Sequence, residues 1–138
     1  MINFNEPCLT GNEEKYILES IKSRKISGDG CFTNRCHAWF EKKLGCKKAL
    51  LTTSCTHALE MTAMLINIEP GDEVITAANT FVATVGAIHE VGAKIKFVDC
   101  DDTFCIDTNQ IEKSITKKTK AIMPVHFTGS MPNMEKLK

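Results

Sequence analysis

From residue 48 onward, short apolar runs alternate with longer stretches that have helical periodicity. The apolar runs are typical of buried strands, and strands separated by helices favour right-handed βαβ units. Turn signals at Pro70-Gly71-Asp72 and Val91-Gly92-Ala93 fall where a helix must stop before the next strand begins. The pattern predicts an α/β fold, with a mainly parallel sheet and flanking helices. The expected strands are 49–52, 73–76, 94–98 and 120–125, with helices at 56–67, 80–91 and 108–114.

The residues before this region have a helical pattern instead. A first helix is expected over 12–24, where the last residues are basic and suit a helix C-terminus. The turn Ser27-Gly28-Asp29-Gly30 cannot continue it, because glycine and aspartate favour turn geometry. Thr33 can then cap a second helix that ends at Gly45. We expect one domain over 1–138, with a helical N-terminal arm at 1–46 and a βαβ sheet region at 47–138.

Charge and cysteine content exclude several classes of function. Lys+Arg and Asp+Glu both number 17, so no basic field gathers nucleic acid or an anionic membrane surface. No apolar run approaches the roughly 20 residues that span a bilayer. The 7 cysteines form no CxxC pair and follow no signal peptide, so we expect reduced thiols, a cytoplasmic location and no metal site.

The residues that follow each expected strand are polar. In open α/β sheets ligands collect at the carboxyl ends of the strands. After the first strand come Thr53, Ser54, Cys55 and Thr56, at the start of a helix. Hydroxyl groups and free backbone N–H groups at a helix start suit a phosphate. The alternative is an ordinary Ser/Thr N-cap, which needs no ligand.

The next three strand ends add other side chains to the same edge. Phe81 follows the second strand and suits stacking on a flat ring, although a core phenylalanine is the commoner case. Asp99 ends the third strand, where it can also cap a turn, and His126 ends the fourth, where it can also be a hydrogen-bonded core histidine. Together these residues describe one polar rim that could hold a phosphorylated ring.

These residues resemble one known family over essentially the whole chain: the DegT/DnrJ/EryC1/StrS sugar aminotransferases, of pyridoxal phosphate (PLP) fold type I. Within the family, Gly28-Asp29-Gly30 and Ser54-Cys55-Thr56 are most similar to transaminases that make dTDP-4-amino-4,6-dideoxygalactose for bacterial surface polysaccharides, such as lipopolysaccharide and enterobacterial common antigen. The resemblance implies the N-terminal part of the fold type I large domain. The matching segments are 2–7, 27–30, 32–33, 51–56, 70–74, 79–82, 98–99 and 124–127.

The resemblance also implies roles for individual residues, with PLP as cofactor. Cys55 and Thr56 would hold the cofactor phosphate, Phe81 would stack on the pyridine ring, and Thr80 and Thr84 would support that face. The loop Gly28, Asp29 and Gly30 would approach the sugar, while Ser54, Asp99 and His126 would lie next to the site.

The implied reaction transfers an amino group from glutamate to the keto carbon of a dTDP-linked 4-keto-6-deoxy sugar. The resemblance places the Schiff-base lysine beyond Lys138, so no catalytic residue is expected within 1–138 and the isolated chain is expected to be inactive. Lys94, Lys96 and Lys120 flank strand starts, at the edge opposite the rim, and are expected to be surface lysines. Family members are homodimers, so the expected partner is a second copy or a complementing C-terminal chain.

Two other functions are compatible with the pattern. One is a non-catalytic module that binds a phosphate or nucleotide sugar, because fold does not dictate function. The other is an unrelated Rossmann-type nucleotide binder, which the absence of G-x-G-x-x-G at the first βα turn disfavours.

Overall fold

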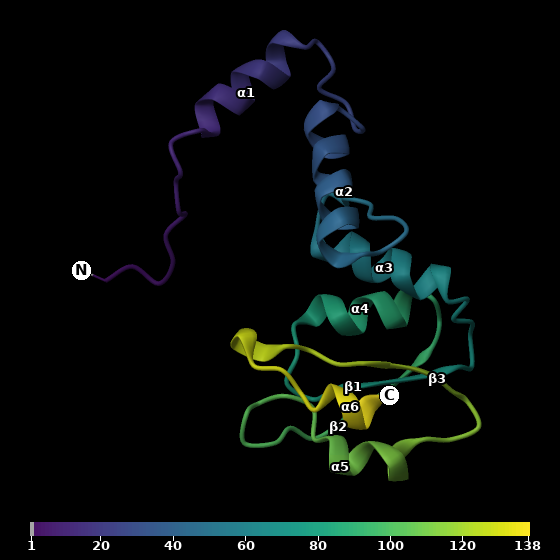
Figure 1. Cartoon of the computed structure of the whole chain (residues 1–138). Helices are drawn as coiled ribbons and strands as arrows, with labels where there is room; N and C mark the ends of the chain where they lie inside the picture. The colour runs from purple at the N-terminus through teal and green to yellow at the C-terminus, as the bar shows by residue number, and fades with distance from the viewer. Residues whose placement is uncertain (1) are drawn as a thin grey trace. The chain divides into compact units, whose positions relative to one another are not determined.

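A computed structural model describes residues 2–138, and its contacts divide the chain into two compact units, one ending at Leu51 and the other spanning Thr52–Lys138. The first unit contains α1 (Glu13–Lys22) and α2 (Cys31–Leu44), so both expected helices are confirmed (Figure 1). The prediction that Thr33 caps the second helix is wrong. Gly30 is the N-cap, because its backbone is extended, and Thr33 lies inside the first turn.

The turn before α2 is confirmed, with a difference in detail. Asp29 has a φ of 58°, whereas Gly28 and Gly30 are not among the residues with positive φ. Aspartate tolerates this left-handed conformation better than most residues. At the other end of α2, Gly45 has a φ of 66° and ends the helix as predicted.

The expected strand at 49–52 does not form among the described residues. The Ala49 N–H donates to Glu41 Oε1 (3.2 Å) and the Leu51 N–H donates to His37 Nε2 (2.8 Å). Glu41 and His37 are one turn apart on α2 and bind alternate N–H groups of the extended segment. In a sheet, these N–H groups would donate to the carbonyls of a neighbouring strand. Here they donate to side chains of a helix instead.

The second unit is built on a three-stranded parallel sheet with the order β2-β1-β3. Its strands are β1 (Glu73–Ala77), β2 (Lys94–Val98) and β3 (Thr119–Met123). The α/β class with a parallel sheet and flanking helices is therefore confirmed, with three strands in place of the four expected. The last strand ends at Met123, before Pro124, which lacks a backbone N–H for strand pairing.

Helices cover both faces of this sheet (Figure 1). One face packs against α3 (Cys55–Leu65) and α4 (Val82–Glu90), and the other against α5 (Thr108–Ile111). Successive residues of β1 point to opposite faces, as in any strand. The first core therefore joins Val74 to Ala63, Ile68, Ile88 and Ala93, and the second joins Ile75 and Ala77 to Val98, Ile106 and Ile111.

Shorter elements complete the second unit. The 3-10 helix η1 (Glu112–Ser114) continues α5, and η2 (Phe127–Gly129) and α6 (Met134–Leu137) follow β3. Gly92 has a φ of 75° in the turn before β2, and an added Cβ would lie 3.0 Å from Pro70 Cγ. Glycine is therefore required at this turn on two grounds, conformation and close approach.

Two absences among residues 2–138 bear on function. No helix is both long and apolar enough to cross a membrane. Within the same residues, no three His, Cys, Asp or Glu side chains are grouped so that they could hold a metal ion. The 7 cysteines are free thiols, and Cys105 alone among them is buried.

Candidate functional site

The carboxyl ends of the three strands meet at one edge of the sheet. Ala77 and Val98 are register partners, and the Ala78 N–H donates to the Val98 carbonyl at 2.9 Å. On the other side of β1, Thr76 pairs with Met123, and its hydroxyl donates to the Met123 carbonyl at 2.9 Å. The residues that follow each strand therefore leave the sheet side by side, as the sequence predicted.

The start of α3 lies toward the same edge. A short loop, 66–72, joins the end of α3 to the start of β1, so the end of this helix lies at the amino edge of the sheet. With a rise of about 1.5 Å per residue, α3 is nearly as long as a five-residue strand at about 3.3 Å per residue. The helix lies beside α4 (Figure 1), and Ala63 packs on the sheet, so the chain direction places the first turn of α3 toward the carboxyl edge.

The turn before α3 is held by its own side chains. The Ser54 backbone is extended, and its Oγ accepts a hydrogen bond from the His57 N–H at 3.1 Å, so Ser54 forms the N-cap that the sequence allowed as the alternative to a phosphate site. The Thr52 hydroxyl donates to the Ser54 carbonyl at 2.7 Å. Thr53 Oγ1 and His57 Nδ1 are hydrogen-bonded at 2.5 Å.

Among residues 2–138, the first two residues of α3 have backbone N–H groups with no acceptor. An α-helix leaves its first four N–H groups without intrahelical partners. At α3 these four groups belong to the N-cap Ser54 and to Cys55, Thr56 and His57, and the first intrahelical bond runs from the Ala58 N–H to the Ser54 carbonyl at 3.2 Å. The His57 N–H is bound by Ser54 Oγ. Within residues 2–138, the N–H groups of Cys55 and Thr56 take part in no hydrogen bond. Both groups are thus available to an anion, where the helix dipole favours negative charge.

Phe81 is the N-cap residue of α4, and its side chain is 73% exposed. This exposure excludes the alternative that the ring fills the helix–sheet core. An exposed aromatic ring at the carboxyl edge of the sheet offers a flat apolar surface to a ligand.

Thr80 and Thr84 form a hydrogen-bonded pair at the start of α4. The Thr80 hydroxyl donates to Thr84 Oγ1 at 2.9 Å, and Thr84 is only 6% exposed. Because Thr84 is buried, it anchors Thr80 and so fixes the backbone on either side of Phe81.

Asp99 and His126 are both exposed, and the segments that carry them are in contact. The Phe104 and Phe127 rings lie 6.0 Å apart, and the Cys105 thiol donates to the Ser130 carbonyl at 3.4 Å. The alternative of a core histidine at 126 is wrong, because His126 follows β3 and precedes η2 at the surface.

Asp101, and not Asp99, caps the turn after β2. Asp101 Oδ1 accepts hydrogen bonds from the Thr103 N–H (2.8 Å) and hydroxyl (2.5 Å). Asp99 contributes only its carbonyl, which accepts from the Asp107 N–H at 2.9 Å. The Asp99 carboxylate is therefore not needed to hold this turn.

The loop Gly28, Asp29 and Gly30 belongs to the first unit. The Asp29 carbonyl accepts a hydrogen bond from Asn34 Nδ2 at 3.4 Å, so the loop is tied to the first turn of α2. The Asp29 side chain is exposed.

His57 is a functional candidate that was not predicted from the sequence. Its ring and its backbone N–H both bind residues of the turn before α3. The spacing of Thr53 and His57 could have indicated this contact, because a hydroxyl residue four positions before a histidine can reach it across a helix start.

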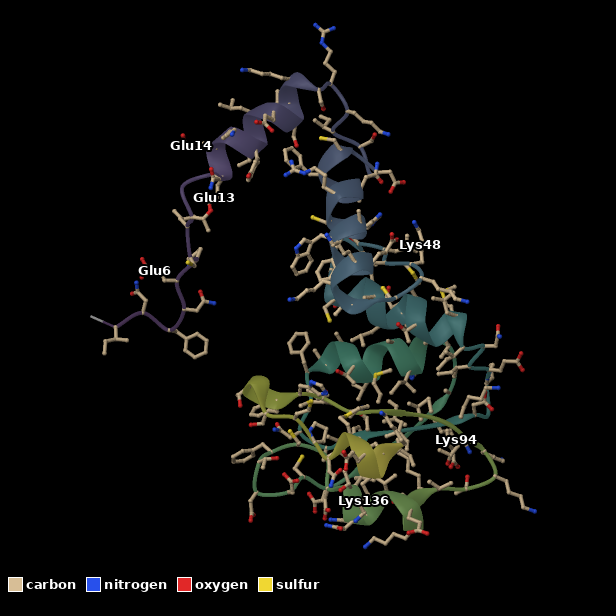
Figure 2. All side chains as sticks on the ribbon, in the orientation of Figure 1. Glu6, Glu13, Glu14, Lys48, Lys94 and Lys136 are labelled. Atoms are coloured by element: carbon tan, nitrogen blue, oxygen red, sulfur yellow. The ribbon has the colours of Figure 1, made fainter. Side chains whose placement is uncertain are left out.

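Lysines at the opposite edge lie where the sequence predicted. Lys94, labelled in Figure 2, is the first residue of β2 and is exposed. Lys120 is the second residue of β3 and is also exposed. Lys96 lies in the middle of β2 rather than at its start, with its Nζ 3.9 Å from Glu73 Oε2. Glu73 opens β1, so this ion pair also lies away from the carboxyl edge.

Comparisons with known proteins agree with this geometry. GDP-perosamine synthases of Escherichia coli O157:H7 and Caulobacter vibrioides are each 37% identical to the chain, over 133 and 135 residues. These alignments cover 96% and 97% of the chain but only 36% of each relative, so the chain spans about a third of their length.

Solved structures also match nearly the whole of this chain. A protein of Streptococcus pneumoniae assigned as a sugar aminotransferase, in its PLP form, matches with a TM-score of 0.88 and 32% identity, over 99% of this chain and 35% of that one. The E. coli GDP-4-keto-6-deoxy-D-mannose-3-dehydratase with bound hydrated PLP matches with a TM-score of 0.89 and 29% identity, over 99% and 37%. Relatives thus include both an aminotransferase and a dehydratase, and these two structures are of PLP-bound forms.

The model of the DegT/DnrJ/EryC1/StrS aminotransferase family matches residues 7–138, nearly the whole chain. The fold, the sequence identity to sugar aminotransferases and this match agree with the predicted resemblance. The chain therefore belongs to the DegT/DnrJ/EryC1/StrS aminotransferase family.

Proposed function

We propose that this chain supplies the phosphate- and ring-binding part of a PLP-dependent aminotransferase that acts on nucleotide-linked keto-deoxy sugars. The observation that carries the proposal is the start of α3, where the N–H groups of Cys55 and Thr56 are free, together with the exposed Phe81 ring at the start of α4. A phosphorylated pyridine needs an anion site and an apolar flat surface, and this edge of the sheet has both.

The residues present fit the cofactor. The Cys55 N–H, and the N–H and hydroxyl of Thr56, would bind the phosphate, while Ser54 caps the helix behind them. Phe81 would stack on the pyridine ring, with its backbone held by Thr80 and Thr84. When bound, PLP supplies an electron sink for the carbanion left by proton removal.

The remaining site residues would recognise the substrates. Gly28, Asp29 and Gly30 form a loop in which Gly28 and Asp29 are exposed and Gly30 is half-buried. Its backbone can approach a sugar closely, because glycine has no side chain. Asp99 and His126 would lie beside the bound ring; their side chains are exposed and neither is needed for its turn. Glutamate is the proposed amino donor, and the proposed partner is a second copy of the chain or a complementing C-terminal chain, in the cytoplasm.

The proposed acceptor is a nucleotide-linked 4-keto-6-deoxy sugar. The residue pattern favours dTDP as the nucleotide, as in enzymes of surface polysaccharide synthesis, whereas the names of the relatives above refer to GDP-linked compounds. Calorimetric titration of the chain with a dTDP-linked and a GDP-linked keto sugar, in the presence of PLP, distinguishes the two. Binding of neither compound contradicts the substrate class.

Substitution of Thr56 tests the cofactor site. Thr56→Val preserves the shape and the backbone N–H but removes the hydroxyl. A hydrogen bond to a charged group contributes about 1.5–3 kcal/mol, so we expect PLP to bind about 10- to 100-fold more weakly. The measurement is a fluorescence titration of the 138-residue chain with PLP, monitored through its single tryptophan, Trp39, or by equilibrium dialysis.

The matched control is Thr62→Val, which removes an exposed hydroxyl bound to the Ala58 carbonyl on the same helix, away from its start. We expect this variant to bind PLP as the unaltered chain does. Equal PLP affinities for the unaltered chain and Thr56→Val would contradict the assignment. Nucleotide-sugar binding that does not depend on PLP would instead favour the non-catalytic binding module.

A further inference from the structure

The hydrogen bond between Thr53 and His57 has no role in the function proposed so far. Thr53 Oγ1 lies 2.5 Å from His57 Nδ1, and both residues are exposed. Thr53 precedes the N-cap and is outside the helix, whereas His57 is the third residue of α3. The contact therefore spans the helix start and joins residues that flank Cys55 and Thr56 in the sequence.

His57 binds the turn at two places. Its backbone N–H donates to Ser54 Oγ at 3.1 Å, and its ring is bound to the Thr53 hydroxyl. The first contact needs only a peptide group, which any residue but proline supplies. The second needs a side chain at position 57 with a donor or acceptor that can reach Thr53, and here the imidazole supplies it.

We propose that His57 is a positioning residue for the anion site, and this inference rests on the proposed function. Its ring holds Thr53 and so keeps the turn in the conformation that presents the N–H groups of Cys55 and Thr56. Without the ring, an exposed turn has more conformations to lose when a phosphate binds, and the affinity falls by that ordering cost.

The chemistry of the contact suggests a conservative replacement. An imidazole Nδ1 accepts from the Thr53 hydroxyl in one tautomer and donates to it in the other. Asparagine has its amide oxygen and nitrogen bonded to Cγ, as Nδ1 is, and either atom can bind a hydroxyl. His57→Asn therefore retains the contact, whereas His57→Ala removes it and leaves the backbone bond to Ser54.

The experiment measures PLP and pyridoxal affinities of the 138-residue chain and four variants: His57→Ala, His57→Asn, Thr53→Val and the double variant of His57→Ala with Thr53→Val. Pyridoxal lacks the phosphate, so the ratio of the two dissociation constants isolates the anion site from the ring site. Circular dichroism at the same concentration verifies that each variant is folded.

We expect His57→Ala and Thr53→Val each to weaken PLP binding by about 3- to 10-fold, the range for one hydrogen bond, with pyridoxal binding unchanged. His57→Asn should restore most of the loss. The double variant should lose no more than either single one, because both remove the same contact.

Three results would overturn the inference, and only the first of them also contradicts the proposed function. If the unaltered chain binds PLP no better than pyridoxal, the phosphate site itself is absent and the proposed function fails with it. If the chain prefers PLP but His57→Ala has the same preference, the proposed function stands and the positioning role of His57 is wrong. Equal losses in His57→Ala and His57→Asn would also overturn it, because the contact with Thr53 would then not be the cause.

Discussion

The hydroxyl of Thr76 joins β1 to the end of β3, next to the candidate site. Thr76 lies in β1 with no exposed surface, and its hydroxyl donates to the Met123 carbonyl at the end of β3, at 2.9 Å. The residues that follow Met123 lead to His126. Thr76→Val has nearly the same shape as threonine, and it removes this hydrogen bond without opening a cavity.

The expected cost follows from burial. A net hydrogen bond contributes about 0.5–1.5 kcal/mol, and a buried group that loses its partner costs about 1–3 kcal/mol. The added methyl group of valine recovers part of this, since burial of a methylene-sized group contributes about 0.8 kcal/mol. We therefore expect Thr76→Val to lower the free energy of unfolding by about 1–2 kcal/mol.

Urea unfolding followed by far-UV circular dichroism measures this change. With an m-value of about 1–3 kcal/mol/M, the midpoint should fall by roughly 0.5–1 M. The control is Thr62→Val, where the same type of bond, at 2.7 Å to the Ala58 carbonyl, is exposed to solvent. Its midpoint should be within error of the unaltered chain. A midpoint for Thr76→Val that is equal to or above that of the unaltered chain would refute the reasoning.

Two further predictions concern other parts of the chain. Hydrogen bonds, chiefly from the Thr10 N–H, lower the pKa of the exposed Glu13 carboxyl from 4.5 to about 2, with Gly11 also a donor. Because the folded pKa is below the unfolded one, the stabilisation from these hydrogen bonds is complete above about pH 4.5 and is lost as the pH falls through about 2. A carboxyl titration by NMR should have its midpoint near 2 and be absent in Glu13→Gln; a midpoint at 4.5 would contradict the prediction. Ile88→Ala should lower the free energy of unfolding by about 2–5 kcal/mol, because Ile88 is fully buried in the core between α4 and the sheet. Ile17→Ala, where the side chain is 60% exposed, should change it little, and equal costs for the two variants in urea unfolding would contradict this picture of the core.

Features that depend on neighbours in the sequence were predictable. The N-cap at Ser54 needs only a hydroxyl and an N–H three residues later, and the helix end at Gly45 needs only a left-handed residue. The parallel sheet was also predictable, because strands separated by helices have few other ways to pair. The resemblance added the family, and the family match confirmed it.

Features that depend on a distant partner were decided by the tertiary structure. Residues 49–52 have the composition of a strand, but a strand exists only where another backbone supplies carbonyls, and here His37 and Glu41 bind the N–H groups instead. The exposure of Phe81 likewise depends on what packs around it, which an apolar pattern does not specify.

In the candidate site, too, local features were predictable and long-range contacts were not. Ser54, Cys55 and Thr56 were identified from their order in the chain, because a helix start leaves its first N–H groups free whatever surrounds it. The bond between Thr53 and His57 depends on one side-chain rotamer, and the contact between the segments after β2 and β3 depends on the sheet that places them side by side. The sequence alone determined which groups are present at the carboxyl edge. Only the folded chain decided which of them meet, because those contacts join atoms that local chain geometry does not bring together.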